Sequence, residues 1–125
     1  MPADLAAATA RPLEEVEEAL RDLADQDVIA LVPGTSYVWL AHPFSAAAAP
    51  FRVVSGDRTW DAICIWDALG VLALVGRDGR VDTRCPDCAG EISVEVRDGN
   101  VVGSEQYVAH FGVPASRWYE DVGYT

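Results

Sequence analysis

The chain has 125 residues, half of them hydrophobic, which is enough for one compact core and a small additional unit. Twenty acidic residues against nine basic ones give a formal net charge of −11, which repels nucleic-acid phosphates and anionic membrane surfaces. No apolar run approaches the roughly 18 residues that span a bilayer, and the N-terminus lacks a signal-peptide pattern, so we expect a cytoplasmic protein that binds neither nucleic acid nor membrane.

The first 41 residues are predicted to form a winged-helix-like unit. A short helix is expected over residues 5–10, and a second helix, opened by a first-turn proline, over 12–25. Two strands, 28–32 and 36–41, flank a Pro-Gly-Thr turn and would form the wing.

Winged helices commonly bind DNA through a recognition helix that carries basic residues. The second predicted helix is acidic instead, so like charges would have to approach one another on DNA. It carries Glu14, Glu15, Glu17, Glu18 and Asp22 against a lone Arg21. A structural or partner-docking role is therefore favoured for this unit.

Pro43 and Pro50 both restrict the residue before them to non-helical conformations, so residues 42–50 are expected to be an extended linker. The remaining residues, 51–125, are predicted to form an α+β core, a small mixed or antiparallel β-sheet with one or two helices. Alternating residues and short apolar runs indicate the strands of this sheet. The predicted strands are 51–54, 81–84, 91–96, 101–102 and 107–113.

The most apolar stretch, residues 60–76, also carries a thiol and a carboxylate, Cys64 and Asp67. Its Ala and Leu content predicts a helix over 62–69, followed by a buried strand or helix over 71–75. A spacing of three in a helix places both side chains on one face, one turn apart, which indicates a soft nucleophile beside a proton carrier. The alternative is a buried small hydrophobe beside a locally paired carboxylate, since free cysteine is among the most buried residue types.

Two tryptophans, Trp60 and Trp66, are expected to form apolar walls close to this pair. An apolar environment raises the pKa of a carboxyl group by penalising its charged form, which suits a proton donor working near neutral pH. The same environment would raise the pKa of the thiol. We therefore expect Cys64 to need a helix N-terminus or a metal to become a thiolate, and its place in the first turn to supply the former.

The other two cysteines, Cys85 and Cys88, form a C-P-D-C motif after a predicted strand. Such a turn is the half-site of a zinc ribbon, in which two thiolates from one turn bind one metal ion. Zinc needs four ligands and there is no second C-x-x-C, so a closed site would require both histidines, Cys64 or a partner chain. A redox-active or spare thiol pair and a purely structural turn are the alternatives.

Seven segments share their order and spacing with a known family, and together they cover most of the chain after Val28. They are H-P-F-S from His42, P-F-R-V from Pro50, W-x3-C-x2-D-A-L-G from Trp60, L-A-L-V-G from Leu72, R-C-P-D-C from Arg84, V-x-H-F from Val108 and P-A-x-R-W-x-x-D-V-G-Y-T from Pro114. In these segments the chain resembles the organomercurial (alkylmercury) lyase family.

The resemblance implies an alkylmercury-lyase-like fold and protonolytic cleavage of a carbon–mercury bond, with Cys64 as thiolate ligand and Asp67 as proton shuttle. It implies no organic cofactor. The family's second catalytic cysteine precedes the V-x-H-F segment, where this chain reads S-E-Q-Y over 104–107. A replacement sulfur would have to come from Cys85, Cys88 or an external thiol.

Three hypotheses about function remain open at this point. The first is a lyase that acts on a small organometal. The second is a non-catalytic module that binds a soft metal ion (Hg, Cu or Zn) through Cys64, Cys85 and Cys88. The third is another small-molecule enzyme on the same scaffold, with Cys64 as nucleophile and Asp67 as acid and base. The sequence does not define the oligomeric state.

Overall fold

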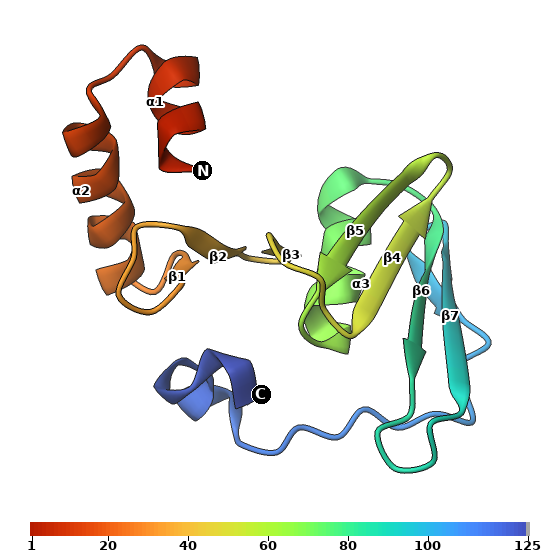
Figure 1. Ribbon diagram of the computed structural model, residues 1–125. Coiled ribbons are helices and arrows are strands. Elements are labelled where there is room, and N and C mark those ends of the chain that lie inside the picture. The colour runs from red at the N-terminus through yellow and green to blue at the C-terminus, as the bar shows by residue number, and fades with distance from the viewer. Residues whose placement is uncertain (125) are drawn as a thin grey trace. The chain divides into compact units, whose positions relative to one another are not determined.

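The computed structural model describes residues 1–124, and the chain divides into two compact units, Met1–His42 and Pro43–Thr125. The first unit contains two helices followed by a β-hairpin (Figure 1). Its elements are α1 (Pro2–Thr9), α2 (Leu13–Asp25), β1 (Ala30–Leu31) and β2 (Val38–Ala41). These are the element types expected for residues 1–41, with shorter strands; the winged-helix assignment itself stays a prediction.

The amphipathic helix α2 holds the first unit together through contacts with α1 and β1. Pro12 stands at its N-cap, where a missing N–H costs nothing. Val16 and Leu20 are buried, whereas Leu13 and Leu23 on the same stripe are 45% and 38% exposed. The apolar face of α2 is therefore only half covered by its own unit.

The second unit is α+β: an antiparallel sheet with one helix, α3 (Ile65–Val75), packed against it. The strand order is β3-β5-β4-β6-β7-β8, and neighbouring strands are antiparallel. The strands are β3 (Phe44–Ser45), β4 (Phe51–Ser55), β5 (Arg58–Ala62), β6 (Gly79–Arg84), β7 (Glu91–Arg97) and β8 (Asn100–Val102). Because β3 pairs with β5, the segment predicted as a linker over 42–50 contributes a strand to the sheet.

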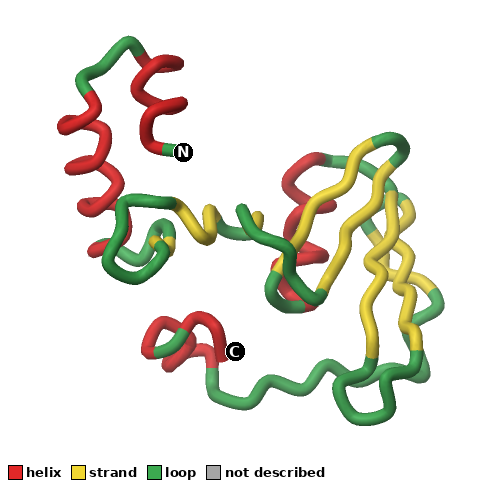
Figure 2. Tube along the Cα trace, in the orientation of Figure 1, coloured by secondary structure: helices red, strands yellow, loops and turns green. Residues whose placement is uncertain are grey.

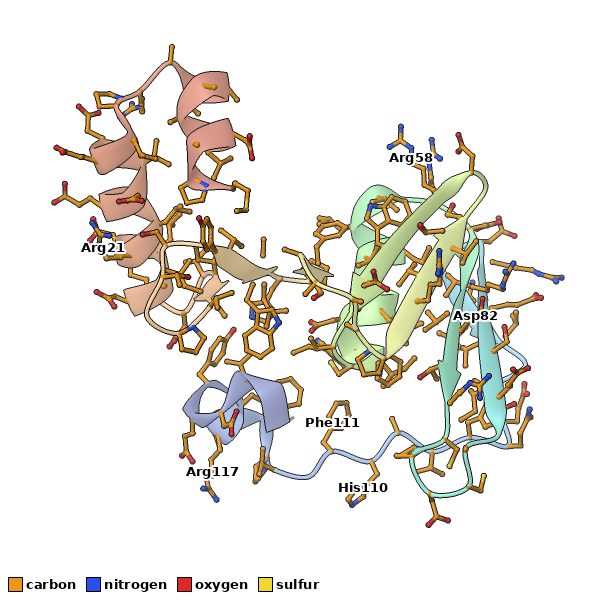
Figure 3. All side chains as sticks on the ribbon, viewed as in Figure 1. Arg21, Arg58, Asp82, His110, Phe111 and Arg117 are labelled. Atoms are coloured by element: carbon orange, nitrogen blue, oxygen red, sulfur yellow. The ribbon has the colours of Figure 1, made fainter. Side chains whose placement is uncertain are left out.

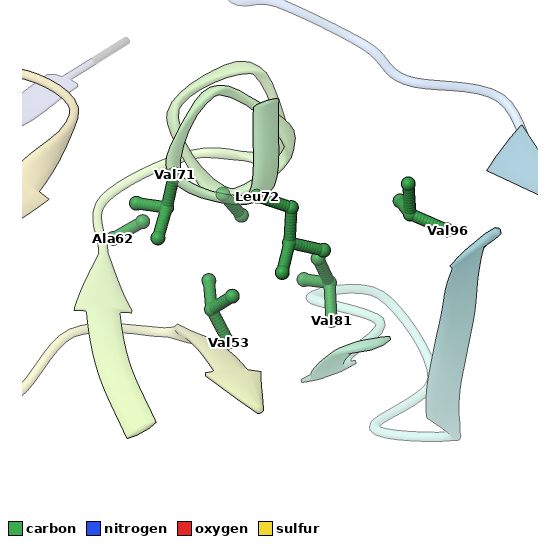
Figure 4. Packing of buried hydrophobic residues seen from close by; sticks show 7 residues of the cluster. Val53, Ala62, Val71, Leu72, Val81 and Val96 are labelled. Carbon is green, nitrogen blue, oxygen red and sulfur yellow. The ribbon is translucent and has the colours of Figure 1, made fainter. Parts of the chain in front are cut away.

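The core of this unit lies between α3 and one face of the sheet (Figure 4). Val53 of β4 is opposite Val81 of β6, and Val81 is opposite Val94 of β7, so a row of buried valines crosses three strands. Leu72 of α3 packs onto the same cluster and is 1% exposed. The buried cluster comprises Val53, Ala62, Ala68, Val71, Leu72, Val81 and Val96.

The helix α3 differs in both bounds from the predicted helix over 62–69. It begins later, at Ile65, because the chain is still in β5 at Ala62. It also continues through Gly70 to Val75 and ends at Gly76, which adopts the left-handed conformation with φ 62°. An interior glycine costs a helix roughly 1 kcal/mol, and burial of the next two residues against the sheet offsets that cost.

The prediction of a strand over 107–113 is wrong, since this segment is irregular and leads into two 3-10 turns, η1 (Ala115–Glu120) and η2 (Val122–Tyr124), as Figure 2 shows. Its alternation of residues finds no neighbouring strand, and Val108 is 91% exposed. The ring of Phe111 instead contacts that of Trp118, with centroids 5.2 Å apart. His110 points to the opposite side of the chain from Phe111 (Figure 3).

No helix within residues 1–124 combines the length and the apolar character that crossing a bilayer requires.

Candidate functional site

Cys64 lies at the junction between β5 and α3, and it is the N-cap residue of that helix. Its backbone is extended (φ −142°, ψ 170°), and its carbonyl oxygen accepts the N–H of Ala68 at 3.0 Å. Its Sγ accepts the backbone N–H of Asp67 at 3.4 Å. A sulfur therefore occupies the place where an N-cap oxygen usually satisfies a free N–H of the first turn.

Asp67 stands in the first turn of α3, and its side chain interacts with the Cys64 thiol, which donates a hydrogen bond to it. The carboxylate is half-buried, and the thiol is 9% exposed. The structure thus brings together the two residues that the sequence paired, although Cys64 caps the helix and does not lie within it. One sulfur and one carboxylate in contact can exchange a proton directly.

The pKa of the Cys64 thiol is raised above its ordinary value. Burial is the largest cause, and the negative charge of Asp67 adds to it. The N–H groups of Asp67 and Trp66 at the helix N-terminus lower the pKa, but by less. The expectation that the first turn would make Cys64 a thiolate is therefore not met. This cysteine is a protonated thiol at neutral pH until something displaces the proton.

The two tryptophans expected to form apolar walls differ in burial. Trp60, on β5, is partly buried and packs against the core cluster. Trp66 is 67% exposed, because it lies on the side of α3 that faces away from the sheet. The periodicity of a helix fixes this outcome: with Ala68, Val71 and Leu72 buried on one face, position 66 falls outside it.

The loop that joins β6 to β7 contains Cys85 and Cys88, both free of disulfide bonds. The turn is closed by two backbone hydrogen bonds, from Cys85 N–H to the Gly90 carbonyl and from Ala89 N–H to the Cys85 carbonyl, each 2.9 Å long. Cys85 is half-buried and Cys88 is exposed. The N–H groups of Cys88 and Asp87 and the Cys88 thiol donate to the Cys85 sulfur, and this lowers the pKa of Cys85.

Cys64 and Cys85 follow strands that end on the same side of the sheet, at the end where β5 and β6 finish. Both β5 and β6 pair antiparallel with β4, so they run in the same direction (Figure 1). Asp61 and Asp82 are both opposite Arg52, and each cysteine follows its aspartate by three residues. Two strands separated by a third lie roughly 10 Å apart. Within residues 1–124, however, no group of three or more His, Cys, Asp or Glu side chains is arranged to hold a metal ion.

Two hollows in the second unit lie away from this pair. One, of about 700 Å³, is a groove along β6 and β7 whose charges neutralise one another: Arg80 binds Asp82 at 2.8 Å and Arg84 binds Glu91 at 3.1 Å. Figure 3 labels Asp82 on this sheet. The other, of about 500 Å³, lies beside the C-terminal end of α3 and β8. Neither hollow is lined by Cys64 or Asp67.

The segment 104–107, at the expected place of a second catalytic cysteine, is a turn after β8 in which the Tyr107 N–H donates to the Ser104 carbonyl at 2.9 Å. It supplies a hydroxyl, a carboxylate and a phenol, but no sulfur. Within residues 1–124, no second cysteine forms a group with Cys64 and Asp67, and the other two thiols belong to the loop between β6 and β7.

Comparisons with known proteins place the second unit in a family. The model of the MerB family, described as alkylmercury lyase, matches residues 44–125. Among solved structures, the crystal structure of the mercury-bound form of MerB2 has the same fold, with a TM-score of 0.62 at 22% identity. The match covers 81% of this chain and 48% of that one, so this chain spans about half the length of MerB2. A search of curated proteins found no match.

The family match extends from β3 to the end of the chain and includes the sheet, α3, both candidate residues and the C-P-D-C loop. It confirms the expected family and the α+β fold class. This chain is a member of the alkylmercury lyase family.

Proposed function

We propose that this protein cleaves the carbon–mercury bond of small organomercurials by protonolysis. The observation that carries the proposal is the contact between Cys64 and Asp67 at the start of α3. A thiol binds mercury, and a carboxylate that already accepts the thiol proton is placed to pass it on. The family of the chain supports the proposal, as does the fold that it shares with the mercury-bound MerB2.

The first step is binding. The substrate R–Hg–X meets a protonated thiol, so the Cys64 proton moves to the Asp67 carboxylate while the sulfur–mercury bond forms and X⁻ leaves. Mercury replaces the proton, so the raised pKa of the buried thiol does not prevent this exchange.

The second step is cleavage. The Asp67 carboxyl delivers its proton to the carbon, and the electron pair of the breaking carbon–mercury bond forms the new carbon–hydrogen bond. The hydrocarbon R–H leaves, and Hg(II) remains on the Cys64 sulfur beside the restored Asp67 carboxylate. An incoming thiol then removes the ion, since soft thiolates are the preferred ligands of such a metal.

The direct test measures methane released from methylmercury by the full chain with excess low-molecular-weight thiol, by headspace gas chromatography. We expect release above the no-protein background, and its loss in Cys64→Ser. Asp67→Asn should bind mercury but release methane more slowly by roughly 10²- to 10⁴-fold, the usual contribution of general acid catalysis. Asp57→Asn, a change at an exposed carboxylate in the β4–β5 turn, is the matched control and should keep the activity.

A second candidate function is a soft-metal binding module without turnover. It is favoured by one observation: the turn over 104–107 carries no cysteine, and within the described part of the chain no second sulfur joins Cys64 and Asp67 in a metal-binding group. Mercury bound by Cys64 with no methane released in the same assay would decide for this module and against the lyase.

A further inference from the structure

The C-P-D-C loop between β6 and β7 is a second sulfur site in this molecule. We propose that Cys85 and Cys88 together form a dithiolate clamp for a two-coordinate soft cation, and that it takes up the Hg(II) left on Cys64. The uptake role rests on the proposed lyase function, whereas binding of the ion by the loop does not.

The loop is a closed turn that carries both sulfurs. Its two backbone hydrogen bonds close the chain between Cys85 and Gly90, and the hairpin register is continuous below it, from Arg84 opposite Glu91 onward. Neither cysteine of the turn is in a disulfide, so two sulfurs from one hairpin loop are available to the same cation.

The second sulfur is free to adjust. The Cys88 side chain is exposed, and a Cβ at Gly90 would lie 3.3 Å from its Sγ, so the absence of a side chain at position 90 leaves the sulfur room. Linear coordination by two sulfurs requires them to be roughly 4.6 Å apart, twice the ~2.3 Å length of a zinc–sulfur bond. Because the Cys88 side chain is exposed, its rotation can change the distance between the two sulfurs.

The number of ligands selects the ion. A structural zinc site needs four ligands, and within residues 1–124 no group of three or more His, Cys, Asp or Glu side chains is arranged around a metal position. Two thiolates alone suit soft cations that accept linear coordination, such as Hg(II) and Cu(I). The product of the proposed reaction is such a cation, and the Cys64 site offers it one sulfur.

The position of the loop suits a transfer within one unit. Cys64 and Cys85 follow the C-terminal ends of β5 and β6, two strands that run in the same direction on either side of β4. In the exchange, the thiols of Cys85 and Cys88 both bind Hg(II), one of their protons moves to the Cys64 sulfur, and the other proton goes to solvent. Two sulfur–mercury bonds form, the bond between mercury and Cys64 breaks, and no oxidant or reductant is needed.

The first experiment measures binding without catalysis. The reduced full chain receives HgCl₂, a large excess of glutathione is added, and mercury that stays with the protein after gel filtration is measured by atomic spectroscopy. A dithiolate outcompetes a monothiol because its second sulfur binds at a high effective concentration. We expect wild type and Cys64→Ser to retain the ion equally, and the double variant Cys85→Ser/Cys88→Ser to retain at least about tenfold less.

The second experiment tests the transfer. Without external thiol, a chain with both sites should release about two methane molecules from excess methylmercury, because the first Hg(II) vacates Cys64; the double variant should stop at about one. Asp57→Asn, a change at an exposed carboxylate in the β4–β5 turn that keeps all three sulfurs, is the matched control in both experiments and should behave as wild type. Circular dichroism of the double variant checks that it is folded.

The outcomes separate the two proposals. Equal retention of mercury by the wild type and the folded double variant would overturn the clamp, as would a disulfide between Cys85 and Cys88 in protein purified under reducing conditions. Equal methane yields without thiol from those two proteins would overturn the transfer. Failure of methane release by every variant, with mercury still retained by Cys64→Ser, would overturn the lyase function and leave the clamp standing.

Discussion

The three cysteines of this chain differ in their burial and in the hydrogen-bond donors around their sulfur atoms. Cys64 is buried beside a carboxylate, which raises its thiol pKa. Cys85 accepts hydrogen bonds from the turn that surrounds it, which lowers its thiol pKa. Cys88 is the exposed member of that pair. Burial and hydrogen-bond donors, not residue type, therefore determine whether a thiol pKa in this chain is raised or lowered.

These pKa directions predict an order of alkylation. Because the thiolate is the nucleophile, one unit of pKa changes a rate near neutral pH by roughly tenfold. Iodoacetamide at pH 7 should modify Cys85 first and Cys64 last, and the Cys64 rate should keep rising above pH 8.5, about the ordinary thiol pKa. Peptide mapping by mass spectrometry at several pH values measures the three rates. Fastest modification of Cys64 at pH 7 would contradict the raised pKa.

The charge of Asp67 is one cause of the raised Cys64 pKa, and its removal has two opposite consequences. Asp67→Asn removes the repulsion and the acceptor for the thiol proton, while the backbone N–H at position 67 still donates to Sγ. The pKa of Cys64 should fall, so its alkylation at pH 8 should become roughly two- to fivefold faster. Hydrocarbon release should fall in the same variant. Slower alkylation together with slower release would instead indicate a structural role for Asp67.

At the scale of elements, the helix α3 both carries the site and closes the core. Its N-terminus holds Cys64 and Asp67, and its middle turns cover the valine row of the sheet. Close packing is visible at Gly79 of β6, where a Cβ would lie 2.5 Å from the Val54 carbonyl oxygen and 2.7 Å from Leu72 Cδ2. The position of the Cys64 thiol therefore depends on how α3 packs against the sheet.

Two leucines of α3 provide a matched test of that packing. Leu72 is 1% exposed and Leu74, two residues on, is 67% exposed. Leu72→Ala should lower the free energy of unfolding by about 2–5 kcal/mol, the usual cost of truncating a buried leucine. Leu74→Ala should change it by less than about 0.5 kcal/mol. Urea denaturation followed by circular dichroism measures both. Equal losses in the two variants would show that the outer face of α3 is also packed.

At the scale of the whole molecule, the net charge of −11 dominates what can approach the protein. In the first unit, α2 presents mostly exposed acidic side chains, and its one arginine, Arg21, donates to the Ser36 hydroxyl at 3.4 Å. Phosphate contacts from basic residues supply most of the affinity of proteins for DNA. The arrangement of helices and hairpin in this unit therefore lacks the charge that DNA binding requires.

We accordingly expect no binding of duplex DNA by the full chain, even at about 20 mM salt, where electrostatic attraction is strongest. Fluorescence anisotropy of a labelled duplex measures this directly, with a basic DNA-binding protein as the positive control. An increase in anisotropy that disappears as salt is raised would contradict the prediction and would show that the acidic helix is not the contacting surface.

The sequence by itself was sufficient for the family, the α+β class, most strands and the pairing of Cys64 with Asp67. Each depends on local pattern: motif order, alternation of residues, or a spacing of three that survives whether position 64 lies in a helix or caps it. Only the tertiary structure decided that α3 runs through Gly70, that Phe44–Ser45 joins the sheet, and that 107–113 does not. The reason is that a strand forms only beside a neighbouring strand, and a helix tolerates an interior glycine when its neighbours pack against another element. The local sequence of a segment does not specify either partner. The same holds for the thiol pKa of Cys64, which burial raises more than the helix N-terminus lowers it.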